Sequence, residues 1–331
     1  MEEIVGTSNW AVRIRQEIGQ VARGQCGVLI TGPTGTGKEL IARAIHRESP
    51  RAAGPWIVVD CTAIPPTLFA SQLFGHVKGA FSGAEEERQG IIHLSDQGTL
   101  FLDEIADLSL KAQAKILRVL DDGRFRRVGG LTNTRSRFRL VSATNKPLEE
   151  EVKAKRFRRD LLHRLDVIRI QVPPLRERLD DLEELAVYFA RQFMNDSSRL
   201  EYRRFTPEAL SLMRLYSWPG NVRELRNLVH KAALLVEGKE VGAGFVTQNL
   251  GHEVWEESGF YGPEADLAAE GFSMPLHLSM IEERLIIQAM KQAEGVKKFA
   301  ADILGINRTT LVEKIKKRNL SPEDWPVQGA N

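Results

Sequence analysis

The residues from Gly32 to Lys38 have the types and spacing of a phosphate-binding loop. The sequence Gly-Pro-Thr-Gly-Thr-Gly-Lys follows the apolar stretch Gly27–Thr31 and precedes a helical stretch. Glycines let backbone N–H groups turn toward phosphate oxygens, the helix N-terminus adds its positive dipole end, and the lysine reaches the β- and γ-phosphates. We therefore predict that ATP binds to this loop, at Gly32, Pro33, Thr34, Gly35, Thr36, Gly37, Lys38, Glu39 and Leu40.

Two adjacent acidic residues, Asp103 and Glu104, could complete such a site. They follow the apolar stretch Gly98–Leu102, which predicts a strand with both carboxylates at its end. Asp103 suits a magnesium ion, held directly or through water, and Glu104 suits activation of an attacking water. The alternative is a strand end with two solvated acids. Ser or Thr normally follows the lysine and binds Mg²⁺, so Glu39 departs from the general motif. We predict ATP and Mg²⁺ as cofactors.

The first ~170 residues alternate strand-like and helical stretches, which predicts an α/β fold with a mainly parallel sheet. Helices are expected over Leu40–Arg47 and Lys111–Asp122. The expected strands are short apolar runs closed by polar residues: Gly27–Thr31, Trp56–Asp60, Thr99–Asp103, Arg137–Thr144 and Asp166–Val172.

The chain after Pro173–Pro174 changes to helical periodicity, which indicates a small helical subdomain. Gly238 to Pro275 is rich in glycine and acidic residues and has little periodicity, so we interpret it as a linker. The last part is helical again. The expected domains are an ATPase subdomain at 1–172, a helical lid at 173–242, a linker at 243–275 and a helical unit at 276–331.

Composition limits the function classes. The 331 residues are 42% hydrophobic with a net charge of only +2, so a nucleic-acid partner must be argued from local charge. Cys26 and Cys61 form no metal-type spacing. The N-terminus lacks a signal-peptide profile, and no apolar run approaches the ~20 residues that span a bilayer. We expect a cytoplasmic protein with no membrane partner.

Residues 296–318 have the spacing of a helix-turn-helix. Gly305 suits the turn, and Asn307 suits the N-cap of the second helix. Between Gly295 and Leu320, seven Lys or Arg residues against two acidic ones give a local charge of +5. The alternative is a basic bundle that binds protein. Predicted DNA contacts come from the start and the basic side of the second helix: Asn307, Arg308, Thr309, Thr310, Lys314 and Lys317, with Lys316 and Arg318 also suited to phosphates.

The segment Phe74–Ala84 carries a resemblance that covers Ile4 to Leu320, nearly the whole chain. It is similar to the loop of the AAA+ ATPases that activate the sigma-54 form of bacterial RNA polymerase, the nitrogen-regulator-C class of enhancer-binding proteins. Glu39 after the lysine is also typical of that family. The resemblance implies a sigma-54 contact through Gly79, Ala80, Phe81, Ser82, Gly83 and Ala84, with Ser82 where the family usually has Thr. The alternative is a hairpin with Phe81 buried in the core.

Further roles are carried over from the family by position. Val5 resembles the segment beside the adenine, Asn145 the first sensor and Arg223 the second sensor. Arg158 and Arg164 resemble arginine fingers that reach the neighbouring subunit. Arg159 leaves open which arginine acts, and a solvated basic face is the alternative. Two further segments, Lys115–Arg118 and Asp121–Gly130, resemble a helix and second loop that move with the first. Their residues Arg124, Arg126 and Arg127 are expected at a subunit interface or on a loop surface.

Asp60 is a departure, because the family commonly has Asn at this switch position. Two close carboxylates cannot both ionise cheaply, so Asp60 facing Glu104 would raise one pKa. Alternatively, Asp60 turns toward a lysine and has no special role. A Fis-type DNA-binding domain is implied at the C-terminus, where Ile281, Leu285, Ile286 and Ala289 suggest a dimerisation face.

The resemblance implies an ATP-hydrolysing activator that binds upstream DNA and remodels the sigma-54 polymerase closed complex. The rival is a DNA-binding regulator whose ATPase core controls oligomerisation without engaging sigma-54. The implied partners are sigma-54 RNA polymerase holoenzyme, double-stranded enhancer DNA and copies of itself in a ring, usually a hexamer. Only about five residues precede the adenine segment, so we expect no N-terminal regulatory domain and control by a partner protein in trans or by concentration. A chain that is part of a longer protein would look the same.

Overall fold

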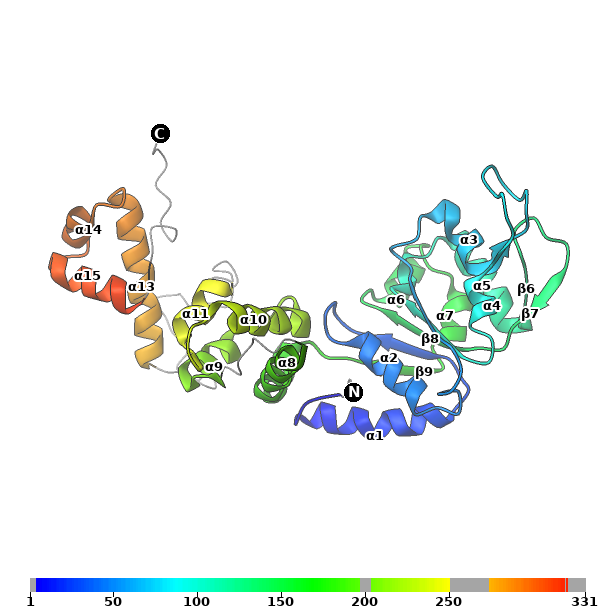
Figure 1. Ribbon diagram of the computed structural model, residues 1–331, viewed down its shortest axis with the longest axis horizontal. Helices are drawn as coiled ribbons and strands as arrows, with labels where there is room; N and C mark the ends of the chain where they lie inside the picture. Colours follow the sequence, from blue (N-terminus) through cyan, green and yellow to red (C-terminus); the bar gives the residue numbers. More distant parts are fainter. Residues whose placement is uncertain (1–3, 197–203, 251–273, 319, 321–331) are drawn as a thin grey trace. The chain divides into compact units, whose positions relative to one another are not determined.

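The computed structural model describes residues 4–196, 204–250, 274–318 and 320 of the chain. These residues belong to two compact units (Figure 1). The first unit comprises residues 1–185 with 218–225, and the second comprises residues 186–217 with 226–331.

A five-stranded parallel sheet forms the centre of the first unit and confirms the predicted α/β class. Three strands begin one or two residues later than predicted, whereas the other two match their predicted ranges. In sheet order the strands are β2 (Trp56–Asp60), β5 (Thr99–Asp103), β8 (Arg139–Thr144), β1 (Val28–Thr31) and β9 (Ile168–Gln171).

Helices cover both faces of this sheet, because successive strand residues point to opposite sides. Val28 and Ile30 pack in one apolar cluster with α1 (Asn9–Arg23) and α2 (Lys38–Arg47) (Figure 1). Leu29 packs in the other. The helices that contribute to that second cluster are α3 (Pro66–Phe74), α4 (Ile91–Leu94), α5 (Leu110–Asp122), α6 (Leu148–Lys153) and α7 (Arg159–Leu165), with the 3-10 helix η1 (Ile105–Asp107).

The first helix is fixed at both ends. The Ser8 hydroxyl accepts a hydrogen bond from the N–H of Ala11 at 3.1 Å, as an N-cap does. At the other end, the buried Arg139 of β8 donates to the carbonyls of Val21 and Ala22. Because Arg139 is the first residue of β8, these bonds join the end of α1 to the edge of the sheet where that strand starts.

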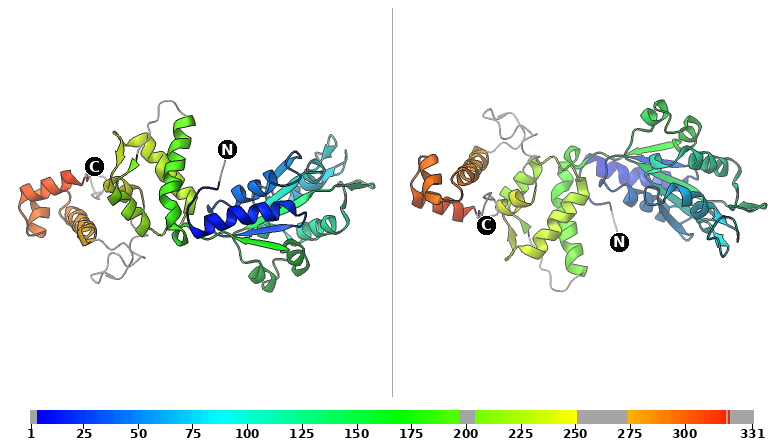
Figure 2. Two further views of the ribbon diagram at one scale, coloured as in Figure 1. Left: turned by 90° about the horizontal axis from the view of Figure 1, so that it is seen from below. Right: turned by 90° about the horizontal axis from the view of Figure 1, so that it is seen from above.

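Two short hairpins are inserted between the helices on the other face. β3 (Gly75–His76) pairs with β4 (Arg88–Gln89), and β6 (Arg124–Arg126) pairs with β7 (Asn133–Arg135), both antiparallel. The β6–β7 hairpin projects from the body of its unit in each view (Figures 1 and 2). After β9, the 3-10 helices η2 (Leu175–Glu177) and η3 (Leu179–Asp181) lead into α8 (Leu182–Asp196).

The second unit is mainly helical, as predicted. Its first part contains α9 (Pro207–Leu215), α10 (Asn221–Leu235, whose first turn belongs to the first unit) and α11 (Ala243–Asn249). The short strands β10 (Arg204–Phe205) and β11 (Glu240–Val241) pair in parallel. The helix α11 lies within the range expected as a linker, and there the apolar Val246 and Leu250 are buried. The remaining linker residues, 251–273, lie outside the described part.

The C-terminal helices are α13 (Met274–Gln292), α14 (Lys297–Ile303) and α15 (Arg308–Lys317), which form one group in both views of Figure 2. They share a core that includes Ile286, Ala289, Ala300 and Leu311. The proposed dimerisation face is therefore wrong in part, because Ile286 and Ala289 are buried in the core of their own domain. Leu285 remains about half exposed. No helix in the described ranges has the length and apolarity needed to cross a bilayer.

Candidate functional site: the carboxyl edge of the sheet

The phosphate loop connects β1 to α2, with its glycines in close contacts. Gly32 has a φ of 154°, and a Cβ there would lie 2.4 Å from the carbonyl oxygen of Val172. Gly35 has a φ of 79°, and its Cβ would lie 2.4 Å from the carbonyl oxygen of Gly220. Only glycine fits either position, so the loop conformation is set by backbone packing on all sides. The remaining loop residues, Pro33, Thr34, Thr36, Gly37, Glu39 and Leu40, lie in the loop or in the first turn of α2.

Lys38 is the first residue of α2, two residues before the predicted helix start at Leu40. Its side chain is only 7% exposed, and its Nζ donates a hydrogen bond of 2.9 Å to the Gly32 carbonyl. The same Nζ lies 3.5 Å from the Glu104 carboxylate. The ammonium is thus held between the start of the loop and the acid at the end of β5.

Glu104 follows β5 in a left-handed conformation, with a φ of 49°. One carboxylate oxygen faces Lys38, and the other accepts a 3.0 Å hydrogen bond from the N–H of Asn145. The Asn145 amide donates at 2.9 Å to the Thr34 hydroxyl in the phosphate loop. Lys38, Glu104, Asn145 and Thr34 form one connected chain of polar groups, which we call the edge network. The sequence predicts Glu104 and Asn145 at strand ends and Lys38 and Thr34 in the phosphate loop, but it does not predict their contacts.

Asp103 occupies the last position of β5, directly beside the edge network. The N–H of Glu104 donates to its carboxylate at 3.1 Å. Burial raises the pKa of the Asp103 carboxyl, an effect that Lys38 and the Glu104 N–H partly oppose. Within the described ranges no three His, Cys, Asp or Glu side chains gather as a metal cluster. One carboxylate beside a phosphate loop nevertheless fits Mg²⁺, which is commonly held by one or two carboxylates together with substrate phosphates.

Asp60 lies next to Asp103 in the sheet, at the end of the neighbouring strand β2. Its carboxylate accepts hydrogen bonds of 2.8 and 2.6 Å from the N–H and hydroxyl of Thr62. The Thr62 hydroxyl lowers the pKa of Asp60, which is opposite to what proton sharing at Asp60 would require. Its partner is also not a lysine. A switch role for Asp60 stays a prediction, and any such role begins with an ionised carboxylate held by Thr62.

A buried arginine shortly after Pro173–Pro174 joins three parts of this site. Arg178 is 5% exposed and donates at 2.9 Å to the Thr36 carbonyl in the phosphate loop. Its guanidinium also lies over the Trp10 ring, 4.5 Å from the centroid, and 3.9 Å from the Asp181 carboxylate. Asp181 is fully buried and accepts hydrogen bonds from the N–H and hydroxyl of Ser8.

The contacts of Arg178 and Asp181 fix the segment where Val5 was predicted to lie beside the adenine. Val5 is partly exposed, and a Cβ on the next residue, Gly6, would lie 2.4 Å from an Asp181 oxygen. No sequence signal singles out this pair, because Arg178 and Asp181 lie in a strongly charged stretch and their burial follows only from the fold.

The second predicted sensor begins α10. The N–H of Arg223 donates at 3.2 Å to the carbonyl of Gly35, whereas its side chain is exposed. The Asn221 side chain donates to the Thr34 carbonyl and accepts from the Leu175 N–H. Trp218, shortly before α10, is 1% exposed. The start of α10 thus contacts the phosphate loop through both backbone and side chain.

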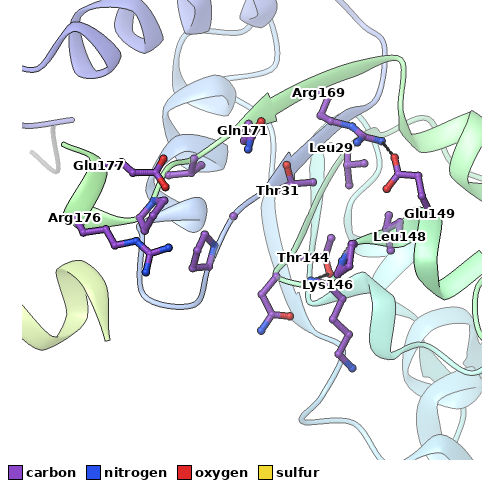
Figure 3. Close-up of a pocket in the computed structure, with 16 residues that line it drawn as sticks. Leu29, Thr31, Thr144, Lys146, Leu148, Glu149, Arg169, Gln171, Arg176 and Glu177 are labelled. Atoms are coloured by element: carbon purple, nitrogen blue, oxygen red, sulfur yellow. Dashed lines mark hydrogen bonds and ion pairs between the residues drawn. The ribbon is translucent and has the colours of Figure 1, made fainter. Parts of the chain in front are cut away.

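A cavity of about 420 Å³ lies at the same edge, beside the ends of β1, β8 and β9 (Figure 3). Arg169 and Glu149 are paired along one side, and Arg176 and Glu177 lie opposite. Gly32, Pro33 and Asn145 are the only predicted nucleotide-site residues in its lining, since Lys38, Asp103 and Arg223 do not line it. The cavity therefore adjoins the edge network and is not the predicted phosphate position.

The predicted sigma-54 loop, residues 79–84, is a closed turn. The N–H of Gly79 donates to the Ala84 carbonyl at 2.8 Å, and the N–H of Ala84 donates to the Phe81 carbonyl at 3.0 Å. Phe81 is 39% exposed, and its ring lies edge-on to that of His76, with ring centroids 5.0 Å apart. Ala80 is partly exposed, and Ser82 and Gly83 are exposed. Phe81 is thus not buried in the core, as the alternative reading required.

Of the two predicted arginine fingers, Arg158 is the N-cap of α7 and Arg164 lies in its last turn, and both have local partners. Arg158 forms a two-pronged pair with Asp160, at 3.0 and 2.6 Å. Arg164 donates to the Leu120 carbonyl and lies 3.5 Å from Asp121. Both side chains remain accessible, at 40% and 52% exposure. Their roles toward a neighbouring subunit stay predictions.

The predicted DNA-binding residues lie on and before α15. Asn307 occupies the N-cap position, although its side chain makes no capping hydrogen bond. Arg308 and Thr309 are exposed, and Thr310 is partly buried. Lys314 is paired with Glu282 of α13, and Arg318 contacts the same carboxylate. Lys317 ends α15, but its side chain lies outside the described ones.

Comparisons with known proteins agree in three parts of the chain. Residues 4–171 match the model of the sigma-54 interaction domain, residues 176–258 that of the AAA+ ATPase lid domain, and residues 277–317 that of the bacterial regulatory protein, Fis family.

Individual relatives cover nearly all of this chain. The Nif-specific regulatory protein of Klebsiella pneumoniae is 42% identical over 96% of this chain and 59% of its own. The transcriptional regulator NtrC of the same species is 39% identical over 95% of this chain and 70% of its own. The crystal structure of NtrX from Brucella abortus in complex with ATP is 33% identical, with a TM-score of 0.71 over 96% of this chain and 70% of that one.

The chain spans between 59% and 66% of the length of the first three curated relatives that it matches. The match nevertheless includes all three parts, from the phosphate loop to the helix-turn-helix. The chain therefore belongs to the family of sigma-54-dependent transcriptional activators, which combine an AAA+ P-loop NTPase with a Fis-type DNA-binding domain.

Proposed function

We propose that this protein hydrolyses ATP and uses the energy to remodel the closed complex of sigma-54 RNA polymerase. The observation that carries the proposal is the edge network, in which Lys38, Glu104, Asn145 and Thr34 are already linked around the phosphate loop. A nucleotide bound in NtrX, a relative with the same fold, supports ATP as the ligand.

The roles of the site residues follow from their positions. Lys38 and the backbone of residues 32–37 would bind the phosphates, Val5 would contact the adenine, and Arg223 would reach the nucleotide from α10. Glu104 would orient the attacking water, since its carboxylate is already fixed by Asn145. Asp103 is the carboxylate placed to hold Mg²⁺, which when bound neutralises phosphate charge.

Assembly would complete the site. In a homo-oligomeric ring, expected to be a hexamer, Arg158 or Arg164 would leave its local carboxylate and face the phosphates of the next subunit. A guanidinium there stabilises transition-state charge and makes hydrolysis depend on the ring. The local partners Asp160 and Asp121 are exposed enough for such an exchange.

Residues 79–84 would contact sigma-54 and transmit to it the conformational change that ATP hydrolysis causes. The helix-turn-helix would bind upstream double-stranded DNA. The exposed Phe81 supports the sigma-54 contact, because an accessible aromatic on a glycine-bounded turn is suited to a partner surface. We assign residues 1–172 to the ATPase subdomain, 173–242 to the lid, 243–275 to a linker that includes α11, and 276–331 to the DNA-binding unit. A regulatory partner in trans is a further expectation.

The deciding experiment is sigma-54-dependent transcription in vitro with hydrolysable and non-hydrolysable ATP. Glu104→Gln should retain ATP binding and lose hydrolysis and open-complex formation together. Phe81→Ala should retain hydrolysis and lose open-complex formation. Phe69→Leu, a conservative change in the buried core, serves as a control for folding effects. Activation that survives Phe81→Ala would instead favour a regulator whose ATPase controls only oligomerisation.

A further inference from the structure

The β6–β7 hairpin, residues 124–135, has two faces of different character. Phe125 is 5% exposed and packs near Phe74, with ring centroids 6.1 Å apart. Because side chains alternate along a strand, Arg124 and Arg126 point away from that core, and both are exposed. Arg135 on β7 is exposed as well. The outer face of the hairpin therefore carries three arginines, which we call the arginine face.

Two of these arginines lie directly opposite each other. Arg124 pairs with Arg135 in the antiparallel register, so their Cβ atoms are about 4.5–5.5 Å apart. Like charges in such a position destabilise a hairpin. Neither side chain has a hydrogen bond or an ion pair with any described residue, so the repulsion is not relieved within the described part of the chain.

The charge around this pair is uniformly positive. Residues 124–137 contain five arginines and no acidic residue. Arg127 is already paired with Glu87 at 3.4 Å, and Arg126 donates to the side chain of Asn133 at 2.7 Å. The acidic residues Glu85 and Glu86 on the neighbouring loop make no ion pair with the arginine face. The opposed pair, Arg124 and Arg135, thus remains available for an external anion.

The end of the hairpin is narrow and apolar. Leu131 is 89% exposed, and the preceding residues are Gly129 and Gly130. A two-stranded ribbon of this kind is the size of element that the major groove of duplex DNA, about 12 Å wide, can admit. A DNA duplex carries one negative charge per about 1.7 Å of its axis, so two neighbouring arginines can each contact a phosphate.

The hairpin is also joined by its backbone to the base of loop 79–84. The N–H of Val77 donates to the Val128 carbonyl at 3.1 Å, and the N–H of Val128 donates to the Gly75 carbonyl at 2.9 Å. A Cβ on Gly129 would lie 2.8 Å from the Ala80 side chain. A partner that contacts loop 79–84 therefore also lies close to the hairpin.

We propose that the arginine face of the β6–β7 hairpin binds the phosphate backbone of duplex DNA, as a second DNA contact besides the helix-turn-helix. Arg124 and Arg135 contact phosphates, and Leu131 lies at the DNA surface. The proposal goes beyond ATP-driven remodelling and does not depend on it, because it concerns binding to DNA alone.

The test uses the full chain and a random-sequence duplex. For Arg124→Gln/Arg135→Gln, we expect the slope of log affinity against log salt to become shallower by about 1.8, corresponding to two lost phosphate contacts. Affinity at 0.1 M salt should fall on the order of tenfold or more. Arg13→Gln/Arg47→Gln removes the same charge from exposed positions on α1 and α2 and should leave the slope unchanged. In parallel, a photo-crosslinking residue at position 131 should label the duplex.

Two results would overturn the proposal. One is a salt slope for the hairpin variant equal to that of the control variant. The other is crosslinking from position 131 to another copy of this chain and not to the duplex, which would make the hairpin a protein-docking surface. Failure of the proposed ATPase function would be visible separately, because neither DNA measurement requires ATP or polymerase.

Discussion

The phosphate loop and α15, the second helix of the helix-turn-helix and here called the recognition helix, both contain basic residues, but the two regions hold them in different ways. Lys38 is 7% exposed and lies between a carbonyl and the Glu104 carboxylate. Arg308 at the start of α15 is exposed, and Lys314 farther along is neutralised by Glu282. The first region holds its cation in a fixed geometry among buried partners, whereas the second carries its basic residues at the surface, exposed or in partly exposed ion pairs. Substitutions in the first should therefore act strongly and independently of salt, and those in the second weakly and with salt dependence.

The largest effect is expected at Lys38. Lys38→Ala removes the ammonium held beside Glu104 and leaves that carboxylate without its cation. We expect ATP affinity and turnover to fall by on the order of 10³-fold, as for the loss of a central electrostatic group. Binding of a fluorescent ATP analogue and phosphate release measure the two quantities. Lys153→Ala, an exposed position on α6, is the matched control. A loss that high salt largely restores would contradict the fixed-geometry account.

The strands of this region could be predicted closely from sequence because short apolar runs with polar ends identify buried parallel strands. Trp56–Asp60 and Thr99–Asp103 match to the residue. The edge network could not be predicted in the same way. Asn145 and Thr34 are 111 positions apart, and their hydrogen bond depends on how two loops pack. A local sequence pattern carries no information on contacts between residues so far apart in the chain. The resemblance to a family indicates the roles of these residues, and only the structure shows their contacts.

The recognition helix shows the opposite limit of sequence reasoning. The local charge of +5 over residues 295–320 omits Glu282, which lies on α13 outside that segment and pairs with both Lys314 and Arg318. A residue's charge can be read from sequence, but its neutralisation by a distant partner cannot. Asp60 shows the same limit, since its hydrogen bonds to Thr62 replaced both partners considered for it.

A buried positioning residue should give the next largest effect. Arg178→Lys keeps the charge but loses the fork that spans the Thr36 carbonyl, the Trp10 ring and Asp181. We expect the KM for ATP to rise about tenfold, which corresponds to one lost charged hydrogen bond, with a smaller change in kcat. Steady-state kinetics and the Tm separate binding from folding. Arg176→Lys, two positions away, is the control, and a change confined to Tm would mean that Arg178 is purely structural.

A smaller, sequence-dependent loss is expected at Arg308. Arg308→Ala should weaken binding to a duplex recovered by in vitro selection by about tenfold to a hundredfold, as for one base contact of about 1–3 kcal/mol. Binding to random duplex should change little. Titrations on both duplexes measure this difference, with Lys291→Ala on α13 as the control. Equal losses on both duplexes would reassign Arg308 to phosphate contact.

A substitution at Glu282 is expected to strengthen DNA binding, unlike the substitutions above. Glu282→Gln removes the carboxylate that holds Lys314 and Arg318, so more positive charge becomes available to phosphates. We expect tighter binding to random duplex and a salt slope steeper by about 1–2. The fold should lose less than about 1 kcal/mol, because these pairs are partly exposed and screened. An unchanged slope would show that the two basic residues already contact DNA while paired.

The smallest expected effect is on the pH dependence of the free energy of unfolding, which differs between His46 in the first unit and Glu282 in the second. His46 is buried behind the sheet, with its Nδ1 2.9 Å from the Thr99 hydroxyl, and burial lowers its pKa below the ordinary 6.5. The unfolded chain therefore binds the proton more tightly, so the free energy of unfolding is highest above pH 6.5 and falls as the pH drops below it. The Lys314 hydrogen bond lowers the pKa of Glu282, so its contribution is present above pH 4.5 and is lost only as the pH falls below that value. The free energy of unfolding, measured by urea unfolding followed by tryptophan fluorescence, should thus fall between pH 6.5 and pH 5 in the wild type. It should fall less in His46→Gln, and it should fall as much as in the wild type in Glu282→Gln. An equal fall of the free energy of unfolding in His46→Gln would show that another titratable group causes the acid sensitivity of the first unit.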